Sequence, residues 1–385
     1  MQMRHIYRHI GWLTGCMLML LLAVGCSSGS EDAESPLPKE KPVLKVYVFA
    51  PEKPIVTRAD IGNVDASAEE AAINTLDVWV FETGTTTLVG HVHQSNISWD
   101  GQKEVAINVS DDFASRKPDV DIYVAANADA AGLALGATST ASALESAIIA
   151  SDYFGLTSPV SSVPVEGLPM SGLLKEQTVT DTSPVFAVTP RVNLVRAVSK
   201  VRFIFTKSVS VANDESLKVN SISLNGGVLP KQEYLFNSSD NVDADNYETA
   251  AATLVSEVSG DAINSCDNPS AYIYKVEQTG QAYENLINYG LEEHVVEDVT
   301  TPAALSELGR FYLRESDKKL AGTISFTSDG IAKSKTFEMD EDGDFSRNHT
   351  WIVYAYFLGG GELKVNVVNV KSWTAQDGTH PVYNW

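Results

Sequence analysis

Residues 44–49 alternate apolar side chains with polar or aromatic ones. Leu44, Val46 and Val48 share one side of this pattern, and Lys45 begins the other side. A period of two residues is typical of a strand that has one face in a hydrophobic core. The pattern therefore predicts a half-buried β-strand over residues 44–49.

Two prolines follow this strand. Pro51 and Pro54 cannot donate a hydrogen bond to a neighbouring strand, so we expect sheet pairing to end there. The segment behind them contains Arg58 and Ala59 and is predicted to be extended and exposed. We expect a strand that a protease can release by cutting after Arg58; the alternative is an ordinary loop arginine.

Alternation of the same kind recurs along the chain and predicts a mainly β protein. Further strands are expected near residues 76–81, 88–92, 105–109, 120–124, 185–188, 201–205, 217–224, 272–274, 311–313, 323–326, 351–357 and 363–370, the last with a bulge. Short helices are expected at residues 71–73, 141–150 and 301–309, a loop at 111–118 and a turn at 168–172.

The chain is long enough for more than one hydrophobic core. Its 385 residues suit a leader and two domains of about 150 to 190 residues each. A second cycle of strands, in an order similar to the first, begins after Pro190. We therefore expect one domain over residues 59–190 and another over residues 191–385.

The N-terminus has the features of an export signal. Arg4 and Arg8 precede an apolar stretch over residues 10–24, which is short for a membrane span. Small residues then lead to Cys26, in a pattern that resembles the cleavage box of bacterial lipoproteins, in which the cysteine is lipidated. We expect residues 1–26 to be a lipoprotein signal peptide; an ordinary signal peptide is the alternative.

Composition and charge limit the classes of partner. Hydrophobic residues make up 44% of the chain and charged residues 20%, as in a folded globular protein. The net charge of −22 disfavours nucleic acid and anionic lipid, because each contact would add repulsion. Cys266 is the only cysteine after Cys26, so we expect no disulfide within the mature chain and a buried thiol at Cys266.

The sequence lacks the motifs of common catalytic sites, such as Gly-x-Ser-x-Gly, His-Glu-x-x-His and Cys-x-x-Cys. His91 and His93 share a strand face, but no carboxylate is expected at ligand spacing, so exposed histidines are favoured over a metal site. Residues 340–344 lack the last glutamate of a calcium loop and predict a polar turn. We expect no enzyme, no metal and no cofactor.

Release of the strand over residues 44–49 would open an apolar groove in its sheet. About five side chains would lose their burial, at roughly 1.5 to 3 kcal/mol each and near 10 kcal/mol in all. Such a groove recruits another strand, and the C-terminal end of the chain offers one. The candidate donor residues are Leu363, Val365, Val367, Val370, Trp373, Tyr383 and Trp385. One groove and one donor per subunit make a heterologous contact, which generates a filament.

The order of these features resembles that of Bacteroidales fimbrillins, the shaft subunits of lipoprotein-derived surface fimbriae. The resemblance extends over essentially the whole chain and is carried by the lipoprotein box, the strand before Thr57-Arg58-Ala59, and the segments 76–81, 168–172, 194–201, 347–349 and the tail that ends in Trp385. It implies two transthyretin-like β-sandwich domains of Greek-key type with a few short helices.

The resemblance also implies a route of assembly. The precursor would be exported as an outer-membrane lipoprotein carrying palmitate on Cys26, its only contact with a membrane. An arginine-specific protease would cut between Arg58 and Ala59 and remove the propeptide 27–58 with its strand. A donor strand within residues 362–385 would then replace that strand in the next subunit, in a fimbria that serves cell adhesion and biofilm formation.

The implied partners are other copies of the chain, other fimbrial subunits, the protease, and ligands on host or bacterial surfaces. Arg196-Ala197 is a second bond of the same type, but it precedes a strongly patterned strand and is expected to be shielded. The alternatives are a fimbrial tip adhesin, an anchor subunit that keeps its lipid and first strand, and a non-polymerising surface lipoprotein that binds glycan. A hydrolase is disfavoured by the missing acid–base residues.

Overall fold

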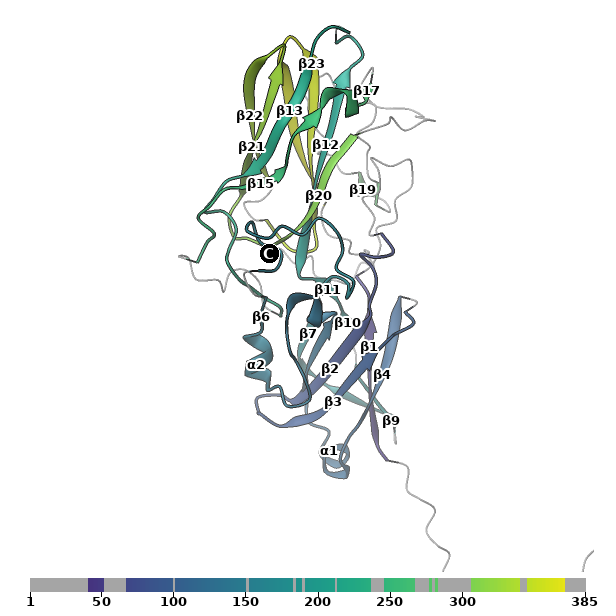
Figure 1. The fold of residues 1–385 in the computed structure, drawn as a ribbon. Helices are drawn as coiled ribbons and strands as arrows, with labels where there is room; N and C mark the ends of the chain where they lie inside the picture. Colours follow the sequence, from purple (N-terminus) through teal and green to yellow (C-terminus); the bar gives the residue numbers. More distant parts are fainter. Residues whose placement is uncertain are drawn as a thin grey trace, which may run out of the picture. The chain divides into compact units, whose positions relative to one another are not determined.

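The computed structural model describes residues 41–51, 67–99, 101–149, 152–182, 185–188, 191–211, 213–236, 246–266, 277–278, 281–282, 306–339 and 345–370. In these ranges the chain is built mainly of β-strands, with two short α-helices (Figure 1). This confirms the mainly β fold class predicted from the alternating pattern. No helix in these ranges is long and apolar enough to cross a lipid bilayer.

Two five-stranded sheets come from the first half of the chain. Sheet 1 contains β4 (Gln102–Asn108), β1 (Val43–Phe49), β8 (Val179–Thr182), β9 (Val185–Val188) and β10 (Val192–Asn193). Sheet 2 has the order β3 (Leu88–Ser95), β2 (Thr75–Glu82), β5 (Val120–Ala126), β7 (Met170–Gln177) and β11 (Val195–Arg196).

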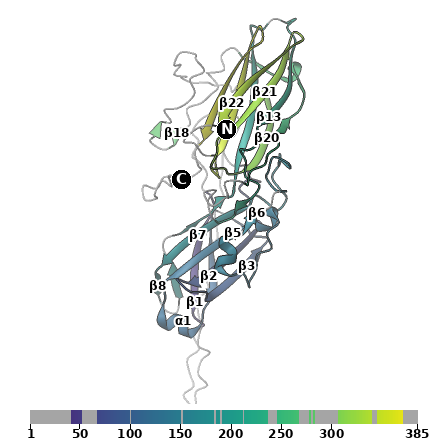
Figure 2. The ribbon, with the colours of Figure 1, turned by 90° about the vertical axis from the view of Figure 1, so that its left-hand side faces the viewer.

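Two further five-stranded sheets come from the second half. Sheet 3 contains β17 (Ser265–Cys266), β20 (Ser306–Arg314), β12 (Val198–Ser208), β23 (Thr350–Gly359) and β24 (Glu362–Val370). Sheet 4 contains β15 (Ala252–Val255), β16 (Val258–Ser259), β13 (Leu217–Leu224), β21 (Leu320–Ser328) and β22 (Ile331–Met339), of which β13, β21 and β22 are seen side by side in Figure 2.

Short elements connect these sheets. They are α1 (Asp111–Arg116), the 3-10 helix η1 (Ala128–Ala131), α2 (Ala141–Glu145), β6 (Ile148–Ile149), β14 (Glu233–Tyr234), the 3-10 helix η3 (Gly260–Ala262), β18 (Glu277–Gln278) and β19 (Gln281–Ala282). Strand β6 pairs with β14, so the two halves of the chain share one two-stranded ladder.

Each pair of sheets encloses its own hydrophobic core. Sheets 1 and 2 bury one apolar cluster, to which Val46 of β1 and Val78 of β2 contribute. Sheets 3 and 4 bury another, to which Phe203 of β12 and Phe326 of β21 contribute. Two sheets with a shared apolar interior form a β-sandwich, and we call these the first and second sandwich.

Two local predictions were wrong because a short polar signal was misjudged. Residues 111–116 form α1 instead of a loop: the side chain of Ser110 accepts a hydrogen bond from the Phe113 amide (3.1 Å), and Phe113 is buried. Residues 68–71 form a turn instead of leading into a helix. The capping contacts between Ser67 and Glu70 do form, at 2.8 and 3.2 Å, but one turn without further residues does not sustain a helix.

Two other predictions were overridden by sheet pairing. Met170 begins β7 instead of lying in a turn, and it pairs with Ala126 and Arg196. Residues 306–309, expected at the end of a helix, belong to β20, which pairs with β12. The bulge expected near the end of β24 lies instead at its start, where the register with β23 shifts between Phe357 and Gly359. The strand predicted at residues 272–274 and the turn at residues 340–344 lie outside the described residues.

Candidate functional site

Strand β1 is hydrogen-bonded along both of its edges. On one side it runs antiparallel to β4 over seven residues, from Val43 opposite Asn108 to Phe49 opposite Gln102. On the other side it runs parallel to β9 at residues 43–45 and parallel to β10 at residues 48–49. Figure 1 shows β1 beside β4 and β9. The predicted strand is therefore confirmed, and it occupies an interior position of sheet 1.

The alternation in β1 separates a core face from an outer face. Leu44, Val46 and Val48 are 0% exposed and belong to the core of the first sandwich. The other four residues of the strand are partly exposed. Removal of β1 would therefore take three core side chains out of the sheet, fewer than the five expected from the sequence.

The outer face of β1 carries polar contacts. Lys45 forms an ion pair with Glu104 of β4, with 2.7 Å between Nζ and Oε1. This hydrogen bond raises the pKa of Lys45 and holds the pKa of Glu104 below its usual value. The guanidinium of Arg191 lies 4.5 Å from the centre of the Phe49 ring, as in a cation–π contact. The outer face of β1 is thus matched to its neighbours by charge as well as by backbone pairing.

The pairing of β1 ends close to the prolines. The Ala50 amide donates to the Gly101 carbonyl (3.1 Å) and the Leu194 amide donates to the Phe49 carbonyl (2.9 Å). The described residues stop at Pro51 and resume at residue 67. Arg58 and Ala59 therefore lie outside the described residues, as does Cys26.

The other Arg-Ala bond is deeply buried. Arg196 is 2% exposed and Ala197 is 0% exposed. The Arg196 side chain donates to the Glu70 carbonyl (3.0 Å) and to Oδ1 of Asn348 (3.1 Å). A protease needs an extended, accessible segment to bind, so the prediction that Arg196-Ala197 is shielded is confirmed.

Strand β24 has a different place in its sheet. Among the described strands it pairs only with β23, so it is the edge strand of sheet 3. Leu363 is buried in the second core, and Val365 and Val367 pack against that core while remaining partly exposed. Val370 is the last residue of β24. Trp373, Tyr383 and Trp385 lie outside the described residues.

A buried ionic cluster connects Glu70 to β12 and β20. Nζ of Lys200 lies 3.1 Å from Oε2 of Glu70, and the Tyr312 hydroxyl donates to the same carboxylate. Burial alone would raise the pKa of Glu70, but the Lys200 charge and the Tyr312 hydroxyl outweigh it and hold that pKa below its usual value. Burial lowers the pKa of Lys200 to about 8.

A second buried cluster surrounds Arg347. Its guanidinium contacts Glu315 and lies 3.0 Å from Glu233. Burial raises the pKa of Glu233 well above its usual value, and the Arg347 charge only partly offsets this. Arg314 pairs with Glu248 nearby in the second half. Pairs of this kind fix the arrangement of segments that are distant in sequence, since a buried charge without its partner is strongly destabilising.

Sequence reasoning missed these clusters as a site, although it noted the segments 67–70, 194–201 and 347–349, which supply Glu70, Lys200 and Arg347. The available signal was the presence of charged residues inside strongly apolar strands, such as Lys200 and Arg202 in β12. Charged residues in such positions are almost never fully buried without partners. Glu70 and Lys200 are 130 residues apart in the sequence, and no local pattern shows that they are partners.

The histidine pair has a carboxylate partner after all. Nε2 of His91 and Nδ1 of His93 lie 2.8 and 2.9 Å from Oδ1 of Asp77, which projects from the neighbouring strand β2. The expectation that no carboxylate lies at ligand spacing was therefore wrong, and His91 is also less exposed than expected. No group of three or more histidine, cysteine or acidic side chains within the described ranges is arranged to hold a metal ion.

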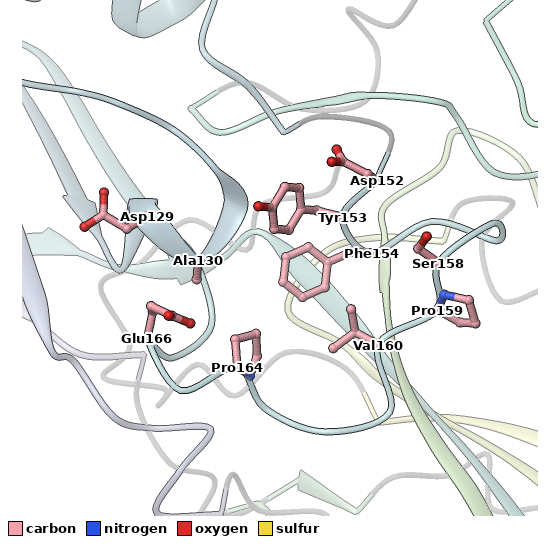
Figure 3. A pocket seen from close by; sticks show the side chains of 10 residues that line it. All are labelled: Asp129, Ala130, Asp152, Tyr153, Phe154, Ser158, Pro159, Val160, Pro164 and Glu166. Carbon is pink, nitrogen blue, oxygen red and sulfur yellow. The ribbon is translucent and has the colours of Figure 1, made fainter.

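A pocket of about 440 Å³ lies between η1 and the segment 152–166 (Figure 3). The rings of Tyr153 and Phe154 stand at its centre, and the carboxylates of Asp129, Asp152 and Glu166 lie around them. All three carboxylates are exposed to solvent. The arrangement lacks an acid–base pair held by a buried partner, so it indicates no particular reaction.

One segment of the chain matches a known family model. Residues 44–226 match the family model described as major fimbrial subunit protein, FimA. The resemblance to fimbrillins is confirmed over this segment. It begins at Leu44 in β1 and includes every strand of sheets 1 and 2, as well as β12 and β13. The matched residues 44–226 therefore contain both the buried strand β1 and the buried bond after Arg196.

Solved structures with a similar arrangement include three fimbrial proteins. The fimbrilin FimA of Porphyromonas gingivalis W83 has a TM-score of 0.46 and 13% identity, with 86% of this chain and 97% of that chain covered. The tip fimbrial protein Mfa3 of Porphyromonas gingivalis has a TM-score of 0.46 and 13% identity, with coverages of 86% and 99%.

The third is a fimbrial assembly protein of Parabacteroides distasonis, with a TM-score of 0.42 and 13% identity, covering 86% of this chain and 96% of that chain. None of the curated proteins compared with the chain matches it. At these identities and TM-scores no conclusion about fold or function rests on the three structures. The resemblance to fimbrial subunits is shown by the match over residues 44–226.

Proposed function

We propose that the chain is a structural subunit of a cell-surface fimbria and polymerises by protease-triggered donor-strand exchange. The observation that carries this proposal is the position of β1. It is an interior strand, yet the rest of sheet 1 is formed by residues that follow it by more than fifty positions in sequence. A single cut in the connecting segment would therefore free β1 without breaking any other strand of its sheet.

The burial of β1 supports a strong drive for its replacement. Three fully buried side chains contribute roughly 5 to 9 kcal/mol together at about 1.5 to 3 kcal/mol each. The vacated place would also leave β4 on one side and β9 and β10 on the other without their hydrogen-bonding partner. A strand from another copy would satisfy both needs, which is the mode of binding by strand addition.

The donor in this proposal lies within residues 362–385 and includes β24. Among the described strands, β24 pairs with β23 alone. An edge strand can leave its sheet without interrupting the pairing of the others. The donor of one subunit and the vacated place in the next form a heterologous contact, which repeats into a filament.

The maturation steps complete the proposal. The precursor is exported with a lipid on Cys26, reaches the outer membrane, and is cut by an arginine-specific protease between Arg58 and Ala59. Residues 27–58, with β1, are lost. The two sandwiches support two domains, and because β10 and β11 belong to the first sandwich we place the proposed boundary after Arg196 instead of Pro190.

The test replaces Arg58 by alanine in the native host. We expect Arg58→Ala to abolish surface filaments and to leave a precursor that retains β1, as seen in electron micrographs and by intact mass. Arg116→Ala is the matched control, because Arg116 is an arginine of α1, outside the proposed cleavage segment, and has a half-exposed side chain. Unchanged filaments in the Arg58→Ala strain would contradict the proposed maturation.

The mass of the mature protein separates this function from its alternatives. A mature chain that begins at Ala59 supports the fimbrial subunit. A mature chain that begins at acylated Cys26 would instead indicate a surface lipoprotein that does not polymerise, or an anchor. A chain that begins at Ala59 and occurs only at filament ends would indicate a tip adhesin.

A further inference from the structure

Strands β1 and β24 share a five-residue pattern. Residues 44–48 read Leu-Lys-Val-Tyr-Val and residues 363–367 read Leu-Lys-Val-Asn-Val. The two segments differ only at Tyr47 and Asn366. Both segments are β-strands, and in both the leucine and the two valines belong to or pack against a hydrophobic core.

Each shared residue has a defined role in sheet 1. Leu44, Val46 and Val48 are fully buried, so their sites accept apolar side chains of limited size. Lys45 forms an ion pair with Glu104, which lies on β4 two residues from Ala106, the residue directly opposite Lys45. The lysine therefore marks both the direction of the strand and its position along β4.

The same residues are less well satisfied in β24. Val365 and Val367 are only partly buried, and the strand has a partner on one edge within the described sheet. Lys364 is partly exposed. In the place of β1, the same pattern would have hydrogen-bonding partners on both edges and three enclosed apolar sites.

We infer that residues 363–367 of one copy occupy the place of residues 44–48 in the next copy, in the same direction and the same register. Leu363 then takes the site of Leu44, Val365 that of Val46 and Val367 that of Val48. Lys364 takes the place of Lys45 and pairs with Glu104. This inference rests on the proposed function and adds to it the identity, direction and register of the donor.

Other placements conflict with the pattern. A shift by one residue turns Lys364 into the core, because side chains alternate between the two faces of a strand. A shift by two residues, or a reversed strand, leaves the lysine away from the place of Lys45. It also puts a valine in the site of Leu44, or puts Leu363 in a site that holds a valine. Such a mismatch is destabilising, because a close-packed core responds to a change of one methylene group.

The register can be read by cross-linking. In the native ladder Lys45 lies opposite Ala106 and Tyr47 lies opposite Glu104. The inferred register therefore places Lys364 opposite Ala106, and Asn366 opposite Glu104, in adjacent copies. Ala106 and Glu104 are exposed on the outer face of β4, so cysteines there can form a disulfide without entering the core.

The experiment uses the full-length precursor, expressed in the native host with Cys266→Ser as background. The two expected pairs are Lys364→Cys with Ala106→Cys, and Asn366→Cys with Glu104→Cys. The matched control is Asn366→Cys with Ala106→Cys, which detects a two-residue shift or a reversed strand. Filaments are isolated, mildly oxidised and separated without reducing agent.

We expect both expected pairs to give ladders of disulfide-linked chains. The control pair should give about tenfold less, because two residues displace the partner by about 6.8 Å, beyond the reach of a disulfide. A ladder from the control pair would overturn the inferred register. Filaments without a ladder from either expected pair would overturn the assignment of residues 363–367 as the donor.

Failure of the proposed function has a separate signature. If the parent strain carries no filaments and its mature chain is monomeric, the proposed assembly is wrong, whatever the cross-links show. A charge reversal gives a second measurement on filaments that do form. Lys364→Glu should reduce the filament yield, and the double variant Lys364→Glu with Glu104→Lys should restore it. If both single variants fold but the double variant does not restore the yield, Lys364 does not pair with Glu104.

Discussion

Strands β1 and β12 have equivalent pairing in their two sandwiches. Strand β1 runs antiparallel to β4 and parallel to β9 and β10. Strand β12 runs antiparallel to β20 and parallel to β23 and β17. In both halves the next long strand in sequence, β2 or β13, belongs to the opposite sheet of the same sandwich. The two strands thus each have an antiparallel neighbour on one edge and a parallel neighbour on the other, and they differ in their residue content.

Their burial shows the difference. Strand β1 has seven residues, of which alternate ones are buried. Strand β12 has eleven residues and is buried on both faces along almost its whole length. One face of β12 contributes Phe203 to the second core. The other face holds Lys200 beside the buried Glu70, and Arg202 beside the partly exposed Glu307.

In the proposed function, an interior position does not by itself make a strand permanent. Strand β1 is buried on one face, whereas β12 is buried on both faces and carries buried charges that need partners. Strand β12 could not leave without uncovering Glu70, a buried carboxylate that relies on Lys200. Strand β1 has apolar contacts on one face and a solvent-exposed ion pair on the other, so another strand of similar pattern can replace it.

The largest predicted effect is on β12. Phe203→Ala removes a ring that is 1% exposed and packs against Phe311 and Phe337. We expect a loss of about 3 to 5 kcal/mol in the free energy of unfolding, measured by urea denaturation of the precursor. The same loss is expected in the assembled subunit, because β12 stays in place. A loss below about 1 kcal/mol would show that the second core repacks around the site.

The second prediction concerns the charge that β12 covers. The pKa of Glu70 lies below its usual value, so the carboxylate stabilises the fold above about pH 4.3, the ordinary value for glutamate. This stabilisation is lost as the pH falls through the pKa of the folded protein. Glu70→Gln should destabilise the precursor by about 3 kcal/mol at pH 7, since it leaves Lys200 buried without its counter-charge.

The measurement for Glu70→Gln is a series of urea midpoints from pH 7 to pH 3. The difference between the parent protein and the variant should shrink as the solution is acidified. Glu338→Gln, at an exposed carboxylate on β22, provides the control and should give a curve close to that of the parent. A difference at Glu70 that stays constant with pH would contradict the assigned role of its charge.

A smaller and more selective effect is expected in β1. Val46→Ala removes two buried methyl groups and should destabilise the precursor by about 1.5 to 3 kcal/mol. The assembled filament should not respond, because β1 is absent from the mature chain in the proposed function. Calorimetry of precursor and filament would compare the two, and equal losses in both forms would show that β1 is retained.

The smallest effect is expected on the outer face of the same strand. Lys45→Ala removes an exposed ion pair with Glu104, and exposed pairs contribute little to stability. The urea midpoint of the precursor should therefore stay unchanged within the error of the measurement. Lys45→Met is the control that keeps most of the side-chain length; a clear shift in Lys45→Ala alone would mean that the aliphatic part of the side chain stabilises β1.

The alternating strands were predictable because their signal is local. Strand β1 was placed to within one residue, and β2, β5, β9 and β13 were also found at the expected places. The fold class followed from these strands. Their neighbours did not, because the pairing of β1 with β9 joins residues about 140 positions apart. No periodicity in either segment specifies such a partner.

The candidate site was only partly predictable. Leu44, Val46 and Val48 were found as a core face, since burial of alternate residues leaves a direct trace in the sequence. That β1 is an interior strand and β24 an edge strand could not be found, because this depends on the order of strands in a sheet. The Glu70–Lys200 pair was missed for a related reason: an isolated lysine in an apolar strand shows that a partner is needed but not which residue supplies it.

The burial of Arg196 has a consequence for the fate of chains that fail to fold. In the folded protein this arginine and the alanine after it are closed off by Glu70 and Asn348. In an unfolded chain the same bond is open to an arginine-specific protease, and a cut there separates β12 and all later strands from the first sandwich. In the proposed function, the protease that matures a folded subunit would therefore also cut a misfolded one at this bond.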